Sequence, residues 1–276
     1  MKPVRKAVIP VAGLGSRFLP ATKCVPKEML PIFDRPVIEL IVRELAAAGV
    51  EDVIFVIPPE GSITPAHFAK NDRLENQLRK KGKHAIADEL NDLADLCRVH
   101  TVVQDEPLGD GHAILQAEKL VDGEDFFAFF GDEILDAEPS APEQLLQARG
   151  DRDGCVLGVQ RVPREDIHKF GIVAPAEGAD TASGDGFEIT GFVEKPHPDH
   201  APSDLALLGK NLCCGRIFDV LKHTEPGQGG EIRLVDAFIH IQQSEPIYGR
   251  VLLGDRFDVG NPRGLLTAAQ HFAAKD

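Results

Sequence analysis

Short apolar runs alternate with more polar segments of helical period along the first half of the chain. The apolar runs have the length of buried strands and lie at residues 7–11, 52–57, 99–103 and 126–130. Between them, apolar residues recur at spacings of three and four, which predicts helices at 37–48, 71–96 and 111–120. This alternation predicts an α/β protein with a Rossmann-like layered fold, in which helices flank a mixed, mostly parallel central sheet.

The second half of the chain is richer in strand-like segments. They lie at residues 155–162, 171–174, 187–193, 205–212 and 247–253. The polar stretch 176–186 predicts an exposed hairpin tip, so we expect additional β-hairpin elements here. A closing helix over 262–274 has Asn261 as its N-cap and Pro262 at its first position. We find no internal repeat and no convincing linker, and therefore expect residues 1–276 to form a single domain.

The composition is that of an ordinary globular protein. With 276 residues and 43% hydrophobic positions, the chain is long enough to bury a sizeable core. It has no apolar run of ~18 residues and no signal-peptide pattern, which predicts a cytoplasmic protein with no membrane partner. The five cysteines are odd in number and show no C-x-x-C spacing, so we expect them to be reduced.

Charge is unevenly distributed along the sequence. The net charge of −14 argues against nucleic acid and anionic membranes as partners, because their phosphates would be repelled. Residues 1–35 nevertheless hold seven basic side chains against two acidic ones. This local surplus would suit a small phosphorylated substrate, although a solvated basic face remains the alternative.

A Gly-rich turn follows the first strand and runs from Val11 to Arg17. It is not a P-loop, because no Gly-Lys-Ser/Thr follows, and Phe18 occupies the place of the third glycine of the dinucleotide-binding pattern. Its backbone N–H groups can still approach an anion closely, and the Arg17 guanidinium can fork onto phosphate oxygens. The proline-rich arm 19–31 then presents two lysines, Lys23 and Lys27, on a stiff backbone. Together these features predict a triphosphate clamp.

Asp132 ends the apolar strand 126–130. Its carboxylate should therefore lie at the carboxyl edge of the sheet, where open α/β folds bind ligands. Carboxylate oxygens suit Mg²⁺, which usually takes only one or two protein carboxylates and keeps several waters. The alternative is that Asp132 merely caps a turn.

The run GLGSRFLPATKCVPKEMLPIFDRP at residues 13–36 closely resembles the signature of bacterial UTP–glucose-1-phosphate uridylyltransferases, also called UDP-glucose pyrophosphorylases, which are sugar nucleotidylyltransferases. Further family-like segments follow in the same order at residues 104–113, 131–132, 170–173, 193–196, 229–232 and 257–261. The resemblance spans about residues 6–270, essentially the whole chain. It implies an enzyme that converts UTP and glucose 1-phosphate to UDP-glucose and pyrophosphate, with Mg²⁺ as cofactor.

The resemblance also implies a role for individual residues. The two metal ligands would be Asp132 and Asp258, and the catalytic cations Arg17, Lys27 and Lys195. The nucleotide would be held by Ala12, Gly13, Gly15, Gln104 and Gly109, and the sugar phosphate by Gly171, Glu194 and Lys195. Residues 1–135 would then form a nucleotide-binding half, residues 136–276 a sugar-binding half, and the assembly a homodimer or homotetramer. For His112 we favour packing or hydrogen bonding behind the site over acid–base chemistry.

The sequence departs from the family's usual pattern at four positions, which are Ser16, Asp110, Glu133 and Asn211. Asp110 adds an anion near the expected base pocket, and Glu133 replaces a frequent second aspartate with a longer side chain. These changes bear on base selectivity and on sugar or metal contacts. The alternatives are therefore a thymidylyltransferase, another sugar-1-phosphate nucleotidylyltransferase, or a non-catalytic paralogue that binds nucleotide sugars and regulates a partner.

Overall fold

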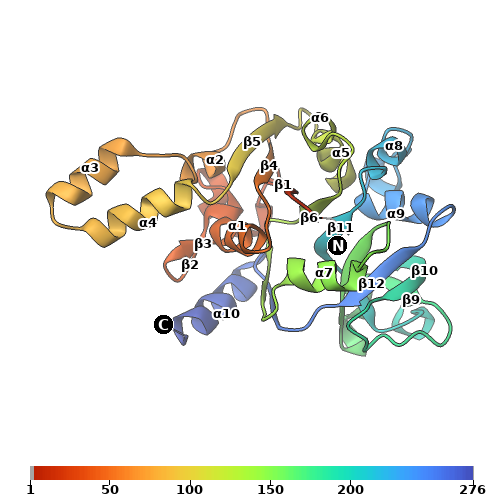
Figure 1. The fold of residues 1–276 in the computed structure, drawn as a ribbon. Coiled ribbons are helices and arrows are strands. Elements are labelled where there is room, and N and C mark those ends of the chain that lie inside the picture. The colour runs from red at the N-terminus through yellow and green to blue at the C-terminus, as the bar shows by residue number, and fades with distance from the viewer. Residues whose placement is uncertain (1–2, 276) are drawn as a thin grey trace.

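A nine-stranded mixed sheet forms the centre of the computed structural model, which describes residues 3–275 (Figure 1). The strand order is β5-β4-β1-β6-β11-β8-β12-β10-β9. In chain order, the strands of this sheet are β1 (Lys6–Pro10), β4 (Asp52–Ile57), β5 (Arg98–Val103), β6 (Phe126–Phe129), β8 (Val156–Arg161), β9 (Gly171–Pro175), β10 (Phe187–Glu194), β11 (Leu205–Cys213) and β12 (Ile247–Val251). Each of the strand-like runs identified in the sequence corresponds to one of these strands.

The sheet is parallel throughout on one side and mixed on the other, where β12 pairs parallel with β8. β5, β4, β1 and β6 are all parallel neighbours, as the alternation of strands and helices predicts. β11 then pairs antiparallel with both β6 and β8, and β10 pairs antiparallel with both β12 and β9. The expectation of a mostly parallel sheet therefore holds for the first half and is wrong for the second. Hairpins such as that between β9 and β10 link antiparallel neighbours without a crossover helix.

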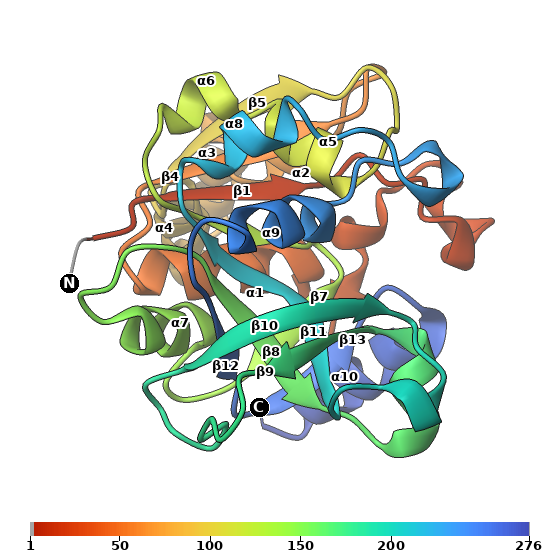
Figure 2. The ribbon, with the colours of Figure 1, turned by 90° about the vertical axis from the view of Figure 1, so that its right-hand side faces the viewer.

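Five strands of the second half close into a ring. β11 pairs with β8, and the order continues through β12, β10 and β9 back to β11, where Ala206 pairs with Ile172. Figure 2 shows these strands together below the parallel part of the sheet. The polar stretch 176–186 connects the antiparallel strands β9 and β10, so the hairpin predicted there is confirmed.

A separate two-stranded ribbon joins residues far apart in the chain. β7 (Glu133–Asp136) pairs antiparallel with β13 (Asp255–Asp258), and Asp258 lies opposite Glu133. The sequence pattern did not predict this ribbon. The closing helix α10 (Pro262–Ala273) follows directly, and the Asn261 side chain accepts a hydrogen bond from the Gly264 N–H at 3.0 Å, as its predicted capping role requires. A third, smaller pairing joins β2 (Pro31–Ile32) and β3 (Arg35–Pro36).

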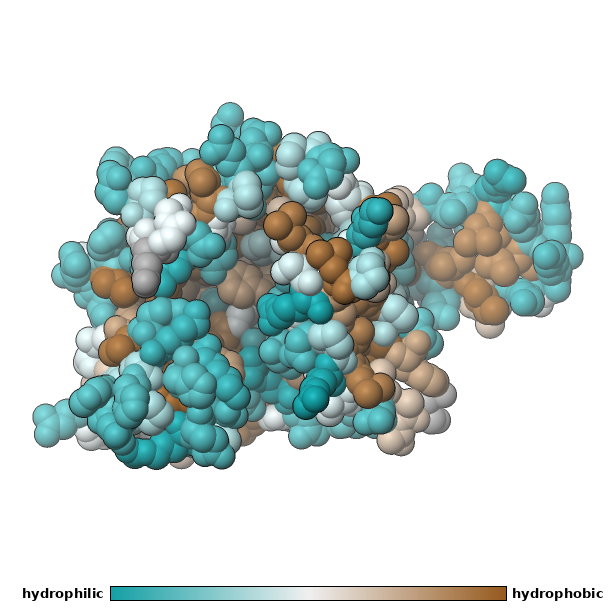
Figure 3. All heavy atoms as spheres, turned by 180° about the vertical axis from the view of Figure 1, so that it is seen from behind, coloured by the Kyte–Doolittle hydropathy of each residue, from teal (hydrophilic) through white to brown (hydrophobic). Residues whose placement is uncertain are grey.

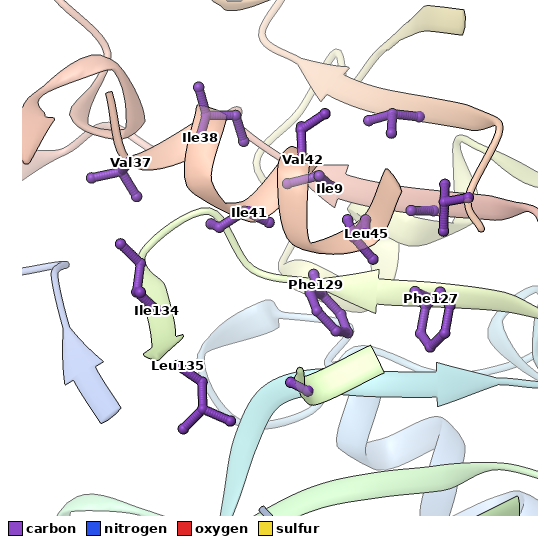
Figure 4. Packing of buried hydrophobic residues seen from close by; sticks show 14 of the residues in the cluster. Ile9, Val37, Ile38, Ile41, Val42, Leu45, Phe127, Phe129, Ile134 and Leu135 are labelled. Carbon is purple, nitrogen blue, oxygen red and sulfur yellow. The ribbon is translucent and has the colours of Figure 1, made fainter. Parts of the chain in front are cut away.

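Helices cover both faces of the sheet. The remaining α-helices are α1 (Val37–Ala47), α2 (Thr64–His67), α3 (Asp72–Lys80), α4 (His84–Ala94), α5 (Asp110–Leu115), α6 (Glu118–Val121), α7 (Ala141–Arg149), α8 (Ile217–Leu221) and α9 (Leu234–Gln242). Successive side chains of a strand point to opposite faces, so Ile9 of β1 packs in the cluster under α1, while Val8 packs in the cluster under α5, α8 and α9. Figure 4 shows Ile38, Ile41 and Leu45 of α1 above the strand that carries Phe127 and Phe129.

A helical arm projects from the body of the molecule (Figure 1). The sequence predicts one helical stretch over 71–96, but the structure has two helices, α3 and α4, separated at Gly82, whose φ of +74° favours glycine and ends the first helix. The predicted helix over 111–120 is likewise divided, into α5 and α6. Apolar side chains gather on one side of the arm in Figure 3, and the exposed Leu74 and Ile86 belong to α3 and α4.

All five cysteines are free thiols, as the sequence predicts. Of the helices within residues 3–275, none combines the length and apolar character needed to cross a membrane.

Glu39 of α1 is buried and accepts hydrogen bonds from three basic side chains. Burial opposes its charge, but hydrogen bonds from His67 at 2.7 Å, Arg43 at 2.8 Å and Arg35 at 2.7 Å lower its pKa to about 2. Since the pKa is depressed from 4.5, the contribution to stability is present above the unfolded value and is lost as the pH falls towards 2.

We therefore expect Glu39→Gln to lower the free energy of unfolding by about 3 kcal/mol at neutral pH and by roughly half as much at a pH near 3. Urea unfolding at both pH values measures the difference. Glu60→Gln, at an exposed position, is the matched control and should change little. Equal losses at the two pH values would show that the charge of Glu39 is not what stabilises the fold.

Candidate active site

Three of the sequence-predicted segments meet at the carboxyl edge of the parallel strands. The Gly-rich turn follows β1, Gln104 follows β5, and Asp132 follows β6 by way of Phe130 and Gly131. Backbone hydrogen bonds continue the sheet past its last residues, from Val11 N–H to the Val56 carbonyl and from Gln104 N–H to the Ile57 carbonyl, both at 2.9 Å. This is the edge at which open α/β sheets bind ligands.

The Gly-rich turn has a backbone conformation and close contacts that leave no room for a side chain at Gly15. Gly15 has a φ of +59°, and the Thr22 hydroxyl donates to its carbonyl at 2.8 Å. A Cβ on Gly15 would lie 3.1 Å from Thr22 Cβ, so both conformation and space require glycine here. A Cβ on Gly13 would lie 3.9 Å from Lys27 Nζ, which places the turn directly beside the lysine of the proline-rich arm. Ala12 is the half-buried residue between β1 and Gly13.

Two acidic side chains and two basic ones meet next to this turn. Lys27 Nζ lies 2.5 Å from Asp132 Oδ2, and Arg17 Nη2 lies 4.0 Å from the same oxygen. A Cβ built on Gly260 would lie 3.0 Å from Asp132 Oδ2 and 3.1 Å from Asp258 Oδ1, so the two carboxylates approach one point.

The β7–β13 ribbon produces this approach. Asp258 lies opposite Glu133, the residue after Asp132, and the Val259 N–H donates to the Asp132 carbonyl at 3.0 Å. The donor set fits a hard divalent cation, because both acidic groups offer carboxylate oxygens and Gly260 leaves the space between them free of a side chain. The two residues that the family resemblance pairs as metal ligands are therefore brought together.

Glu28, next to Lys27, is buried beneath the turn. Its side chain is 1% exposed, and the Thr64 hydroxyl donates to Glu28 Oε1 at 3.0 Å. Burial raises the pKa of this carboxyl above its usual value, and the hydrogen bond from Thr64 only partly offsets that effect. A Cβ on Gly131 would touch Glu28 Cβ at 3.6 Å, so Glu28 links the arm to the end of β6. Glu28 was not among the residues predicted for the site, although an acidic residue inside an apolar, proline-rich run is unusual.

The predicted sugar-phosphate residues form a second group. Glu194 ends β10 and pairs with Gly171 at the start of β9, where a Cβ would lie 3.1 Å from Glu194 Oε2. Lys195 has a φ of +44°, and its Nζ lies 3.1 Å from Glu194 Oε1. Arg233 Nη1 lies 3.9 Å from the same oxygen, a contact that no sequence pattern predicted.

β11 relates this second group to the end of β6. Lys210 of β11 pairs with Phe129, the last residue of β6, and Ala206 pairs with Ile172, the neighbour of Gly171. Four residues of extended strand separate these two pairings, which corresponds to about 13 Å. The Gly171–Glu194–Lys195 group thus lies beyond the carboxyl end of β6, the end at which Asp132 also lies.

Gln104 and Gly109 form a third group. The Gln104 side chain is buried, and its Nε2 donates to the Gly109 carbonyl at 3.0 Å. Gly109 has a φ of +106°, and a Cβ there would lie 2.5 Å from the Ile232 carbonyl oxygen, so glycine is required. Asp110, expected to add an anion to a base pocket, instead accepts from the Leu234 N–H at 2.9 Å, at the start of α9. Burial raises the pKa of Asp110, which opposes its charge.

Glu133 also has a protein partner. Arg256 of β13 donates to Glu133 Oε2 at 3.1 Å, and its guanidinium lies 5.4 Å from the centre of the Phe170 ring. The Phe170 backbone carbonyl accepts a hydrogen bond from the Lys195 N–H at 3.0 Å. Arg256 therefore connects the ribbon that carries Asp258 to the loop that carries Lys195. Neither the Arg256–Glu133 pair nor its contact with Phe170 could be read from the sequence.

Another group of metal-ligating side chains lies at the opposite end of the ribbon. Ligand atoms of Asp136, Asp255 and His271 lie within 4.8 Å of one another. His271 Nε2 is 2.5 Å from Asp136 Oδ2, however, and Lys275 pairs with the same oxygen. This group lies at the other end of the ribbon from the Gly-rich turn and the basic side chains beside it, and we assign no ion to it.

Comparison with known proteins identifies the family of the chain. A family model described as nucleotidyl transferase matches residues 6–275. Over 268 residues, the chain is 43% identical to the UTP–glucose-1-phosphate uridylyltransferase YngB of Bacillus subtilis (strain 168), covering 97% of this chain and 89% of the relative. A second uridylyltransferase of the same organism is 40% identical over 100% of this chain and 93% of its own length.

Solved structures show the same fold. A UTP-bound UGPase from Acinetobacter baumannii has a TM-score of 0.91 and 33% identity, with coverage of 99% of this chain and 94% of that one. A UDP-glucose pyrophosphorylase complexed with UDP-glucose has a TM-score of 0.86 and 29% identity, with coverage of 99% and 100%. The chain therefore belongs to the nucleotidyl transferase family. Within that family its predicted resemblance to the UTP–glucose-1-phosphate uridylyltransferases is confirmed.

Proposed function

We propose that this chain is a Mg²⁺-dependent enzyme that joins UTP to glucose 1-phosphate, forming UDP-glucose and releasing pyrophosphate. The observation that carries the proposal is the meeting of Asp132 and Asp258 beside Lys27, Arg17 and the Gly-rich turn. The relatives that match nearly the whole chain carry the name of this activity, and two similar structures hold UTP or UDP-glucose. A nucleotide with its metal and a sugar phosphate both need such a set of charges.

The two halves of the chain would take the two substrates. Residues 1–135, with their Rossmann-like parallel strands, would form the nucleotide-binding half. Residues 136–276, with the closed ring of strands, would form the sugar-binding half. In the first half, Ala12, Gly13 and Gly15 would present backbone N–H groups to phosphate, and Gln104 and Gly109 would hold the base. The homodimer or homotetramer implied by the family resemblance stays a prediction.

The main task of the site is to reduce repulsion between two polyanions. A pair of unit charges 4 Å apart interacts by about 4 kcal/mol at an effective dielectric near 20. Arg17 and Lys27 would neutralise the triphosphate, and Asp132 with Asp258 would hold Mg²⁺. The bound cation would neutralise the charge that develops on the phosphate oxygens.

The second group would position the attacking phosphate. Glu194 can accept hydrogen bonds from vicinal sugar hydroxyls, and the absence of a side chain on Gly171 leaves room for the sugar ring. Lys195 is 61% exposed at its side chain and can turn its ammonium towards the sugar phosphate. A phosphate oxygen of glucose 1-phosphate would then attack the α-phosphorus of UTP in line with the leaving pyrophosphate. Phosphate is nucleophilic enough without a general base, so catalysis would consist of positioning and electrostatic stabilisation, with no covalent enzyme intermediate.

Pyrophosphate release in a coupled assay tests this proposal. We expect turnover with UTP, glucose 1-phosphate and Mg²⁺, and none after EDTA is added in excess. A panel containing dTTP, CTP and other hexose 1-phosphates would identify a thymidylyltransferase or an enzyme for another sugar. Tight binding of UDP-glucose without turnover would contradict the proposal and identify a regulatory paralogue.

A further inference from the structure

The Gln104 amide is fixed in one orientation by two neighbours. Its Nε2 lies 3.0 Å from the Gly109 carbonyl oxygen and 3.1 Å from His112 Nδ1. An amide NH₂ group has two hydrogens, and these two contacts use both. Turning the amide by 180° would place its oxygen against the Gly109 carbonyl oxygen, two acceptors without a hydrogen between them. The geometry therefore determines which end of the amide faces the protein.

The other end of the amide is left free. Gln104 Oε1 has no hydrogen-bond partner within residues 3–275. Unlike the buried polar atoms that lack a partner, it is open to solvent. Gln104 consequently presents a single acceptor at the carboxyl edge of β5. A uracil or thymine ring has a donor at its imide N–H, whereas the same ring position in cytosine is an acceptor. The free Oε1 matches the first and opposes the second.

His112 has to be an acceptor at Nδ1 for this arrangement to hold. A neutral imidazole accepts at one nitrogen and donates at the other, so the proton belongs on Nε2. Gln116 contacts the ring on that side, with its Nε2 3.2 Å from His112 Nε2 and 3.0 Å from the His112 carbonyl oxygen. With the proton on Nε2, the Gln116 amide cannot donate to the ring, so the half-buried Gln116 side chain must turn away from it and give up its contact with the His112 carbonyl.

We propose that His112 is a positioning residue for base selection, which holds the Gln104 amide so that only Oε1 is offered to the base. The inference rests on the proposed function, because it takes the Gln104 edge as the base site. His112 would not touch the nucleotide itself. Its loss removes one of the two anchors of Gln104, which leaves a buried N–H without a partner and the Gly109 carbonyl as the only remaining contact that orients the amide.

His112→Phe tests the inference, because it keeps the ring and removes the acceptor. We expect the KM for UTP to rise about tenfold with kcat nearly unchanged, since a contact made equally in the ground and transition states is weakened. The preference for UTP over CTP in kcat/KM should fall about tenfold. His112→Asn should restore both within about threefold, because its Oδ1 can accept from Gln104 Nε2. Gln116→Ala, which leaves Nδ1 in place, is the control and should keep the wild-type preference.

Equilibrium binding of UTP and CTP, measured by calorimetry without sugar phosphate, separates this inference from the proposed function. If the wild type prefers UTP, and His112→Phe loses that preference while His112→Asn keeps it, the positioning role is supported whether or not the enzyme turns over. An unchanged preference in His112→Phe, or the same loss in both variants, overturns it. His112→Ala, checked for folding by thermal melting, provides a second variant without the acceptor.

Discussion

Asp132→Asn is expected to lower kcat about a hundredfold to a thousandfold at saturating Mg²⁺, which corresponds to about 3–4 kcal/mol of transition-state stabilisation. The substitution keeps the size of the side chain and one oxygen, but it removes a charge at the point where Asp258, Lys27 and Arg17 meet. We also expect the Mg²⁺ concentration for half-maximal rate to rise. Pyrophosphate release over a Mg²⁺ titration measures both effects.

Asp255→Asn is the matched control for this variant. It makes the same chemical change on the same ribbon, at an exposed residue three positions before Asp258. Its kcat should stay close to the wild-type value, and a thermal melt of each variant would show that the fold is retained. Nearly full turnover of Asp132→Asn at saturating Mg²⁺ would remove Asp132 from the metal site.

Lys195→Ala is expected to lower kcat to a similar extent, about a hundredfold to a thousandfold. Lys195 Nζ lies 3.1 Å from Glu194 Oε1 in the second group, and we propose that this ammonium binds the phosphate of the sugar. In that proposal, the substitution would leave the attacking phosphate without the positive charge of Lys195. Steady-state kinetics with glucose 1-phosphate varied at saturating UTP would give kcat and KM separately.

Lys169→Ala is the corresponding control, because Lys169 is an exposed lysine on the segment just before β9 that pairs with Asp166 at 2.5 Å. Its kinetics should be unchanged. Lys195→Arg tests charge against shape: recovery of a large part of the rate would show that the positive charge is what matters. If Lys195→Ala turned over glucose 1-phosphate at nearly the wild-type rate, the sugar phosphate would have to be bound elsewhere.

The position of Asp132 could be inferred from the sequence by physical reasoning. The apolar strand 126–130 is long enough to cross a sheet, and a polar residue directly after it must emerge at the carboxyl edge. The Gly-rich turn and the stiff arm with Lys27 are local features too, because glycine and proline restrict the backbone of their own segment. Local patterns of this kind were sufficient to predict the strands and helices of the parallel half of the fold.

The position of Asp258 could not be inferred in this way. It depends on the pairing of β7 with β13, two strands of four residues each that lie more than a hundred positions apart in the chain. Short strands carry little periodic signal, and no turn connects these two, so only the family resemblance paired Asp258 with Asp132. The antiparallel return of β11 beside β6 was missed for a related reason, because strand direction is a property of the tertiary fold.

One local signal was present and was overlooked. Ser140 and Glu143 have the spacing of a capping box, and the structure shows both of its hydrogen bonds at the start of α7. The orientation of Gln104, by contrast, depends on a carbonyl group five residues away and on the tautomer of His112. A sequence can identify the residue that could recognise a base. Which atom of that residue faces the base follows only from the three-dimensional structure.

The most direct test of the metal site is a crystal structure of the wild-type protein with UDP-glucose and Mn²⁺, located by its anomalous scattering. We expect a peak about 2 Å from a carboxylate oxygen of both Asp132 and Asp258, with Lys195 on the side of the sugar phosphate. A Mn²⁺ ion bound to the nucleotide but out of reach of either carboxylate would contradict the assignment of this pair as the cation site.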